Sequence, residues 1–345
     1  MPDSIEKYQL SNGLQIMLKE IHTAPIISHW VWYQVGSRNE STGITGISHW
    51  VEHMQFKGTP EFPSTILDKA VSREGGVWNA FTFLDWTTYF ETMPADKIDL
   101  ALRLEADRMV NSNFDPQEVE SERTVIISER QGHENQPLFL LREAVHAAAF
   151  RVHPYHHEII GELSDLQSIQ REDLYNHYQT YYSPNNAVVT VSGDFETERM
   201  LERIRELYEP IPSRNKPRQM VRPEPARRGE HRLNVEGPGE TVYIIAAYHA
   251  PAANDPDFFP YVVLDSLLTG PAGLNMFGGG ISNKTSRLYH SLVEETELAV
   301  SVNGTLPATI DPYLHALTIT VHPQRTPEEV AAALDGEIRR IQETP

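Results

Sequence analysis

Two histidines spaced four residues apart, with a glutamate beside the second, constrain this chain more than any other feature. If the segment is helical, the imidazoles of His49 and His53 lie one turn apart on one face and converge on one point. That spacing suits a zinc ion, which takes nitrogen ligands at about 2.0–2.1 Å. Glu52 lies beside the same face, placed to take a proton from water rather than to bind the metal. A helix that carries polar residues by chance is the alternative, so a third ligand is needed.

Composition limits how such a metal could be held. The chain has no cysteine, which excludes disulfides and thiolate ligands, so any zinc must be bound by histidines and carboxylates. Its 345 residues are enough for two domains. No apolar run approaches the ~20 residues of a membrane-spanning helix. The polar start, Met1–Asn12, lacks the layout of a signal peptide, so we expect a cytoplasmic protein, with a leader removed earlier as the open alternative.

The formal net charge of −19 argues against nucleic acid as a partner, because binding to phosphates depends on clustered Lys and Arg. An acidic protein attracts basic ligands, such as Lys- and Arg-rich peptides, although the charge serves solubility equally well.

The first part of the chain alternates strand and helix patterns. A two-residue turn at Asn12–Gly13 joins two strands, and the β-rich runs 77–83 and 86–92 form a second hairpin. A buried strand is predicted over 26–35 and a helix, capped by Ser64, over 64–73. Further helices are predicted over 98–110 and from Pro116, and the latter places Glu122 and Glu129 two turns apart on one face.

The rest of the chain repeats this order after a linker. A buried strand over 188–192 and a helix over 198–209 end the first domain, and the Pro- and Arg-rich stretch 210–230 reads as a linker. A strand over 241–248 and helices over 258–268, 286–292 and 327–342 follow. We therefore predict domains 1–209 and 231–345. The glycine-rich stretch 270–280 nearly spells a phosphate-binding loop, but Asn283 stands where the second glycine is required, so we reject nucleotide binding.

The block from Gly46 to Glu129 resembles the pitrilysin or insulinase family of zinc metallopeptidases, the inverzincins, and within it the mitochondrial-processing-peptidase branch and similar bacterial enzymes. In that family the third zinc ligand is a glutamate on a separate helix, which corresponds here to Glu129, 76 residues after His53. The resemblance also rests on these segments: Gly75-Gly76, Asn79-Ala80-x-Thr82, Tyr89 and Glu122-Arg123-x-Val125-Ile126. The segment His153–His157 matches a structural segment of the family, so we expect no second metal there.

The resemblance implies roles for single residues. His49, His53 and Glu129 would bind Zn²⁺ and leave a fourth position for water, with Glu52 as the general base. Glu122 would support the site from behind; the alternative is a solvated acid on a helix surface. Asn79 and Ala80 would lie on an exposed edge strand to which a peptide substrate adds; the alternative is an interior strand with Asn79 in a turn.

One departure from the family pattern predicts a partner. Active members carry an Arg and a Tyr on the second domain that hold the substrate, and Val293 and Val300 occupy those positions. We therefore expect a heterodimer in which a homologous subunit supplies the pair. The 115 residues after the linker predict an incomplete second domain. The predicted protein is an α+β zinc endopeptidase of two related domains, each a mixed or antiparallel sheet with helices packed on it. The alternative is a non-catalytic scaffold subunit of the same fold.

Overall fold

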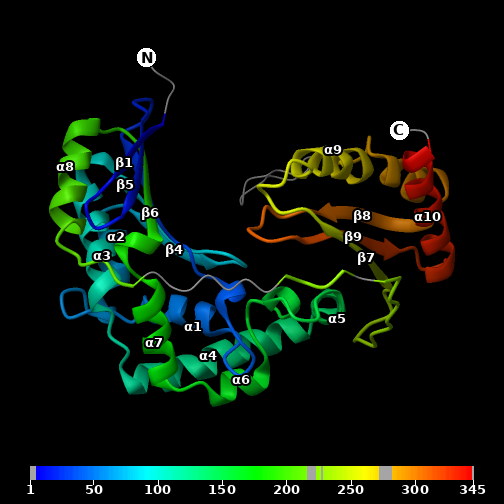
Figure 1. Ribbon diagram of the computed structural model, residues 1–345, viewed down its shortest axis with the longest axis horizontal. Helices are drawn as coiled ribbons and strands as arrows, with labels where there is room; N and C mark the ends of the chain where they lie inside the picture. The colour runs from blue at the N-terminus through cyan, green and yellow to red at the C-terminus, as the bar shows by residue number, and fades with distance from the viewer. Residues whose placement is uncertain (1–4, 216–222, 227, 272–281, 344–345) are drawn as a thin grey trace. The chain divides into compact units, whose positions relative to one another are not determined.

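The computed structural model describes residues 5–215, 223–226, 228–271 and 282–343 (Figure 1). Contacts divide the chain into two compact units, the first containing 1–131 and 152–223 and the second containing 132–151 and 224–345. This grouping differs from the boundaries predicted above, 1–209 and 231–345 around a linker at 210–230, chiefly in assigning 132–151 to the second unit.

A six-stranded sheet in the order β1-β2-β6-β3-β5-β4 forms the centre of the first unit. Neighbouring strands are antiparallel, except for the parallel pair β2 and β6. The predicted strands and the second hairpin are confirmed. The strands are β1 (Glu6–Gln9), β2 (Gln15–Glu20), β3 (Ile26–Tyr33), β4 (Val77–Thr82), β5 (Thr87–Pro94) and β6 (Ala187–Gly193).

The first hairpin has a longer loop than predicted. Leu10 N donates to Leu14 O (2.9 Å) and Gly13 N donates to Leu10 O (3.0 Å), which closes a three-residue loop instead of a two-residue turn. Gly13 takes a left-handed conformation at φ +90°. A turn followed by a left-handed glycine is the second common way to join twisted strands. The Asn12 side chain donates to Tyr208 O (2.7 Å).

Helices cover one face of this sheet. Strand residues alternate between a buried set, such as Val31 and Tyr89, and a partly exposed set, such as Trp30 and Phe90. Ser64 does not cap its helix as predicted, because the N-cap position is Pro63 and Ser64 is the first helical residue. The helices of the unit are α1 (Ile47–Met54), α2 (Ser64–Arg73), α3 (Ile98–Asn111), α4 (Pro116–Glu134, which runs on past residue 131), α6 (Leu163–Ser168), α7 (Arg171–Tyr181) and α8 (Thr197–Tyr208).

The second unit repeats part of this topology. Its described sheet has the order β7-β9-β8 with both pairs antiparallel, as β3-β5-β4 has in the first unit. In both units the middle strand is the last of the three in sequence, which confirms the prediction of two related domains. The helix predicted over 286–292 is instead assigned as the π-helix η5 (Tyr289–Glu295). The other elements are α5 (Pro137–Ala149), β7 (Tyr243–Ala250), α9 (Phe258–Thr269), β8 (Ala299–Thr305), β9 (Tyr313–Val321) and α10 (Pro327–Glu343).

Within the described ranges, none of the helices combines the length and the apolar character needed to cross a membrane. Most of the glycine-rich stretch 270–280 lies outside the described residues, so our rejection of nucleotide binding there stays a prediction.

Candidate metal centre

Helix α1 is fixed in orientation by its apolar side. Trp50, Val51 and Met54 are fully buried, which leaves His49 and His53 on the partly exposed side of the helix. The helix begins after Gly46, whose φ of +84° favours glycine; a Cβ there would lie 2.4 Å from Ile160 O. The backbone of a neighbouring loop therefore packs directly against the start of the helix.

Two buried carboxylates hold the same helix start. Gly46 N and Ser48 N donate to the two oxygens of Glu40 (2.7 and 2.9 Å), and Thr45 donates to Asp165 Oδ2 from its N (3.0 Å) and its Oγ1 (2.7 Å). These bonds satisfy backbone N–H groups that have no partner inside the helix. Burial raises the pKa of Glu40 to about 8. The two backbone donors favour its charged form and offset only part of this rise. The sequence analysis missed both acids.

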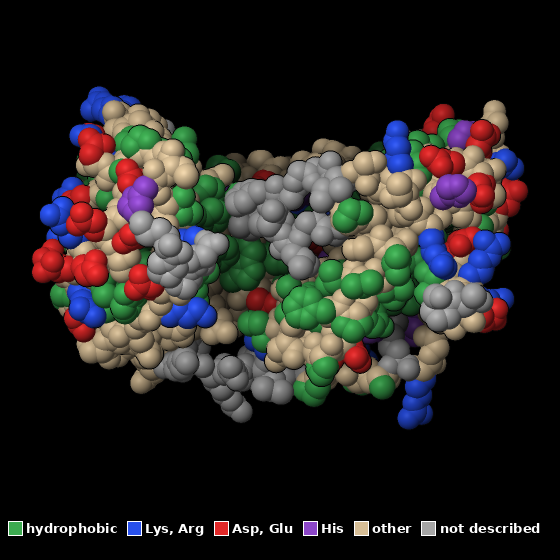
Figure 2. All heavy atoms as spheres, turned by 90° about the horizontal axis from the view of Figure 1, so that it is seen from above, with side chains coloured by type: hydrophobic (Ala, Val, Ile, Leu, Met, Phe, Trp, Pro, Cys, Tyr) green, Lys and Arg blue, Asp and Glu red, His purple; other side chains and the backbone are tan. Residues whose placement is uncertain are grey.

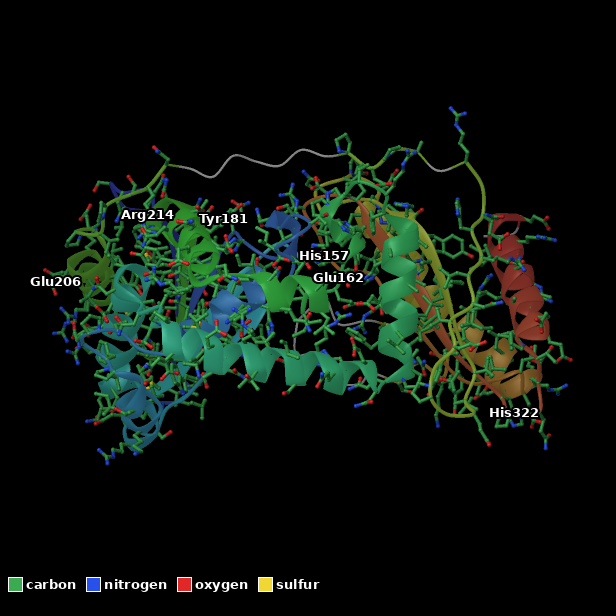
Figure 3. All side chains as sticks on the ribbon, turned by 90° about the horizontal axis from the view of Figure 1, so that it is seen from below. His157, Glu162, Tyr181, Glu206, Arg214 and His322 are labelled. Carbon is green, nitrogen blue, oxygen red and sulfur yellow. The ribbon has the colours of Figure 1, made fainter. Side chains whose placement is uncertain are left out.

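The segment with three histidines supports this region and forms no metal cluster among the described residues. Glu162 N, further along, donates to Thr45 Oγ1 (2.9 Å), and His157 Nε2 lies 3.7 Å from Glu40 Oε2 (Figure 3). Burial lowers the pKa of His157 to about 4, so its imidazole is neutral near pH 7. The contact with Glu40 ties this segment to the start of α1, and the structural role of 153–157 stays a prediction.

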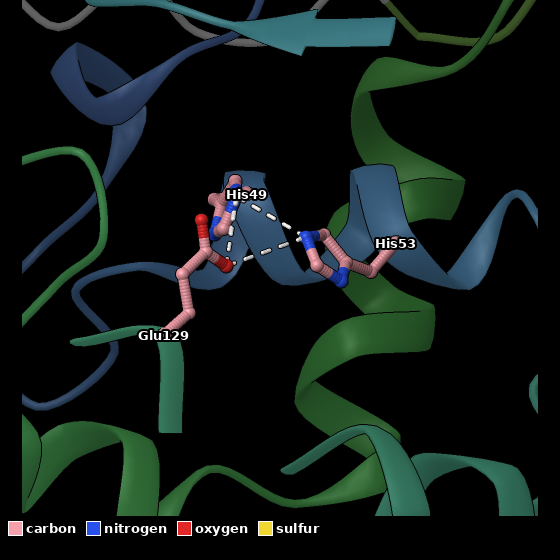
Figure 4. Close-up of side chains that lie close together, drawn as sticks. All are labelled: His49, His53 and Glu129. Carbon is pink, nitrogen blue, oxygen red and sulfur yellow. Dashed lines mark hydrogen bonds and ion pairs between the residues drawn. The ribbon is translucent and has the colours of Figure 1, made fainter. Parts of the chain in front are cut away.

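Helices α1 and α4 bring three predicted ligands together (Figure 4). His49 Nε2 and His53 Nε2 are 3.2 Å apart, and Glu129 Oε2 lies 3.9 Å from the first and 3.8 Å from the second. Ligands about 2.0–2.1 Å from a tetrahedral zinc are separated by about 3.3 Å. Two neutral imidazoles and a carboxylate are also a donor set that zinc takes in catalytic sites. The residues therefore fit the ion in chemistry and in spacing.

Glu122 lies behind His53 and is not a solvated acid. Its Oε1 is 2.7 Å from His53 Nδ1, its side chain is 7% exposed, and Lys57 pairs with its other oxygen. Burial would raise the pKa of Glu122, but its bonds to His53 and Lys57 lower it overall, so it is ionised. Burial would lower the pKa of His53, but the bond to Glu122 and nearby carboxylates raise it overall. A neutral His53 donates from Nδ1 to Glu122 and keeps the Nε2 lone pair directed at the cluster.

Glu52 lies outside the three-residue cluster and has a different environment. It is 7% exposed, and Thr82 Oγ1 donates to its Oε2 at 2.6 Å. Burial raises the pKa of Glu52, and the Thr82 hydrogen bond and His53 offset only part of this rise. A carboxylate with a raised pKa is a stronger base than an ordinary glutamate. Thr82 entered the sequence analysis only as part of a matched segment, without a role.

Strand β4 carries the two residues predicted to bind substrate. It pairs with β5 and is the last strand of the sheet, so the alternative of an interior strand is wrong. Asn79 is exposed within the strand and not in a turn, and Ala80 is buried. Thr82, at the end of the same strand, is the donor to Glu52. The strand thus links the predicted substrate residues to the predicted base.

The two valines that stand where the sequence analysis expected an Arg and a Tyr lie in the second unit. Val293 is in η5 and packs against the hydrophobic core of that unit, and Val300, on β8, is 54% exposed. Neither side chain can donate a hydrogen bond.

Two protein-family models match this chain. Residues 15–162 match the model described as "Insulinase (Peptidase family M16)", and residues 168–345 match the one described as "Peptidase M16 inactive domain". The chain belongs to peptidase family M16. Its curated relatives include a probable mitochondrial-processing peptidase subunit beta of Arabidopsis thaliana (30% identical, covering 85% of this chain and 56% of the relative) and the zinc protease PqqE of Helicobacter pylori (32% identical, covering 85% and 65%).

Solved structures of this M16 fold include a protease from Helicobacter pylori, with a TM-score of 0.87 and 29% identity over 96% of this chain and 79% of that one. An M16 inactive domain from Pseudomonas fluorescens has the same TM-score at 14% identity, covering 99% and 80%, and shows the fold alone. The chain spans 56% and 65% of the lengths of the two curated relatives.

Proposed function

We propose that this M16 chain is the zinc-bearing subunit of an endopeptidase that cleaves extended peptides. The observation that carries the proposal is the meeting of His49, His53 and Glu129 from two helices, with Glu52 beside them. A scaffold has no need of three convergent ligands and a neighbouring base.

Each residue of the site has a chemical task in this proposal. A zinc ion held by His49, His53 and Glu129 would polarise the scissile carbonyl and lower the pKa of water toward 7. Glu52 accepts a proton from the attacking water and passes it to the leaving amine. Glu122 keeps His53 in the tautomer that presents Nε2 to the ion.

Substrate binding in the proposal uses the outer edge of β4. An extended peptide that adds as a strand there gains backbone hydrogen bonds, and folded segments cannot do so. Asn79 and Ala80 contribute their backbone groups. Because Thr82 ends the same strand and contacts Glu52, the strand would place the peptide in a fixed register with the base.

A homologous partner subunit completes the proposal. Val293 and Val300 cannot replace the Arg and Tyr that hold substrate in active relatives, so a second chain would supply them. One relative is named as a subunit, mitochondrial-processing peptidase subunit beta. The same valines, and the match of residues 168–345 to a model described as inactive, favour the alternative of a scaffold subunit without turnover.

Metal analysis separates the two proposals. We expect the purified chain to bind about one zinc per molecule and Glu129→Gln to lose most of it, because a catalytic zinc needs three protein ligands. Glu52→Gln should keep the zinc and peptide binding but lower turnover by several orders of magnitude. The matched control for Glu129→Gln is Glu120→Gln, the same change on α4 at a side chain that is 66% exposed. A chain that binds no zinc would favour the scaffold.

A further inference from the structure

Six aromatic side chains form a continuous surface on the sheet face opposite the helices, here called the aromatic face. All six are partly exposed. Ring centroids are 4.2 Å apart for Trp30 and Phe90, 5.3 Å for Trp30 and Trp32, and 5.7 Å for Phe81 and Phe90. The surface continues through the β4–β5 turn, where Trp86 lies 5.2 Å from Trp32. The six residues are Trp30, Trp32, Phe81, Phe83, Trp86 and Phe90.

Strand register explains why these rings share one face. Phe90 pairs with Trp30 on β3 and with Asn79 on β4, and paired residues of neighbouring strands point to the same side. Phe81 lies two residues after Asn79, so it points to that side as well. Ala80 and Thr82 point to the opposite face, where Thr82 meets Glu52. Edge strand β4 therefore separates the catalytic side of the sheet from its aromatic side.

We propose that the aromatic face is a specificity subsite for substrate side chains. This inference rests on the proposed peptidase function, in which an extended peptide adds to β4. Successive side chains of such a strand point to alternate faces, so every second one meets the aromatic face. Phe81 is the first ring that they reach, with Phe90 and Trp30 behind it. Figure 2 shows hydrophobic side chains gathered on the flank of the first unit.

The chemistry of the surface sets the substrate class. Stacked rings bury large apolar and aromatic side chains and offer few hydrogen-bonding groups. Substrates should therefore be extended peptides with large apolar or aromatic residues at alternate positions. The peptide is the occupant because the surface is continuous with β4, where its backbone would lie.

Two synthetic peptides of equal length and composition test the subsite. One has Leu and Phe at every second position, and the other has the same residues grouped together and Ser elsewhere. Binding to the full chain carrying Glu52→Gln is measured by fluorescence anisotropy of a labelled peptide. We expect the alternating peptide to bind about tenfold more tightly. Phe81→Ser should reduce this preference to about twofold or less, and Trp86→Ser, in the turn, should reduce it by a smaller factor.

The control is Val188→Ser on β6, which points to the same face but lies three strands from β4 and should keep the full preference. Circular dichroism and zinc content confirm that each variant is folded. Equal affinities for the two peptides, or a preference that survives Phe81→Ser, would overturn the subsite and leave the peptidase proposal intact. A retained preference without cleavage by the zinc-loaded chain and its partner would support the subsite and count against the peptidase.

Discussion

Thr82 controls the environment of the proposed base more directly than any other side chain. Its hydroxyl donates to Glu52 Oε2 at 2.6 Å, while burial raises the pKa of Glu52. The hydroxyl therefore stabilises the ionised carboxylate and fixes its direction. It also lies 3.3 Å from Thr87 Oγ1, which donates to Val35 O. Glu52 is thus connected through hydrogen bonds to the hairpin of β4 and β5.

Replacing this hydroxyl by a methyl group tests its effect on catalysis. Thr82→Val keeps the shape of the side chain and removes the donor, so we expect kcat to fall about tenfold, equivalent to ~1.4 kcal/mol. Thr82→Ser should restore most of the rate. Zinc affinity, measured by competition with a chelator, should not change in either variant. Equal rates for Val and Thr would show that Glu52 does not depend on this bond.

At the scale of elements, helix α1 is held from several sides. Glu40 and Asp165 bind its start, and α7 packs beside it through a contact between Ser48 Oγ and His177 Nε2 (3.2 Å). Ser48 Oγ also donates to Gly36 O, so a neutral His177 donates to Ser48. The segment that follows α8 contacts the end of α7, where Arg214 Nη1 donates to Gln179 O at 2.8 Å (Figure 3). These contacts fix the position of α1 and therefore of its two imidazoles.

Acid should weaken this arrangement. Burial lowers the pKa of His177 from 6.5 to about 3. In the unfolded chain the imidazole takes up a proton as the pH falls through 6.5, while in the folded chain it stays neutral until about pH 3. The contribution of His177 to the free energy of unfolding is therefore complete above pH 6.5. Below pH 6.5 the free energy of unfolding falls by up to ~1.4 kcal/mol per pH unit, because the unfolded chain binds the proton and the folded chain does not.

Urea unfolding between pH 7 and 4 measures this effect. His177→Gln should show a smaller loss of unfolding free energy over that range, because Gln has no proton to take up. The control His290→Gln changes an exposed histidine and should keep the wild-type slope. Identical slopes for all three proteins would exclude His177 as a source of acid sensitivity.

At the scale of the whole molecule, the site residues are divided unequally between the two units. The proposed metal ligands, the proposed base and β4, the strand to which we propose that substrate adds, belong to the first unit. The second unit repeats the strand order and carries Val293 and Val300, where the proposal requires a partner subunit to supply an Arg and a Tyr.

A reconstitution assay tests the division of labour between subunits. The zinc-loaded chain alone should cleave peptides slowly. Adding a homologous chain with Arg and Tyr at the positions of Val293 and Val300 should raise kcat/KM by about 100-fold. Removing one hydrogen-bond donor that stabilises a transition state lowers the rate of an enzyme by a factor of this size. A partner in which those two residues are also Val is the control. Full activity from the single chain would refute the heterodimer.

Local patterns in the sequence were sufficient for most of the secondary structure and for part of the site. Alternation located the strands, and the spacing of His49 and His53 located the helix, because both signals depend only on neighbouring residues. Glu129 came from the family resemblance. The predicted length of the first hairpin loop was wrong, because a glycine in the left-handed conformation occurs both in two-residue turns and in three-residue loops.

Only the tertiary structure decided how the site is supported. Glu52 meets Thr82 across 30 residues, His53 meets Glu122 across 69, and Thr45 meets Asp165 across 120. Contacts at such separations depend on how helices pack on the sheet, and no local pattern specifies that packing. The sequence by itself thus determined which side chains have the chemistry to hold and use a metal. The fold decided which buried partners orient them, because burial and hydrogen bonding arise only when distant segments meet.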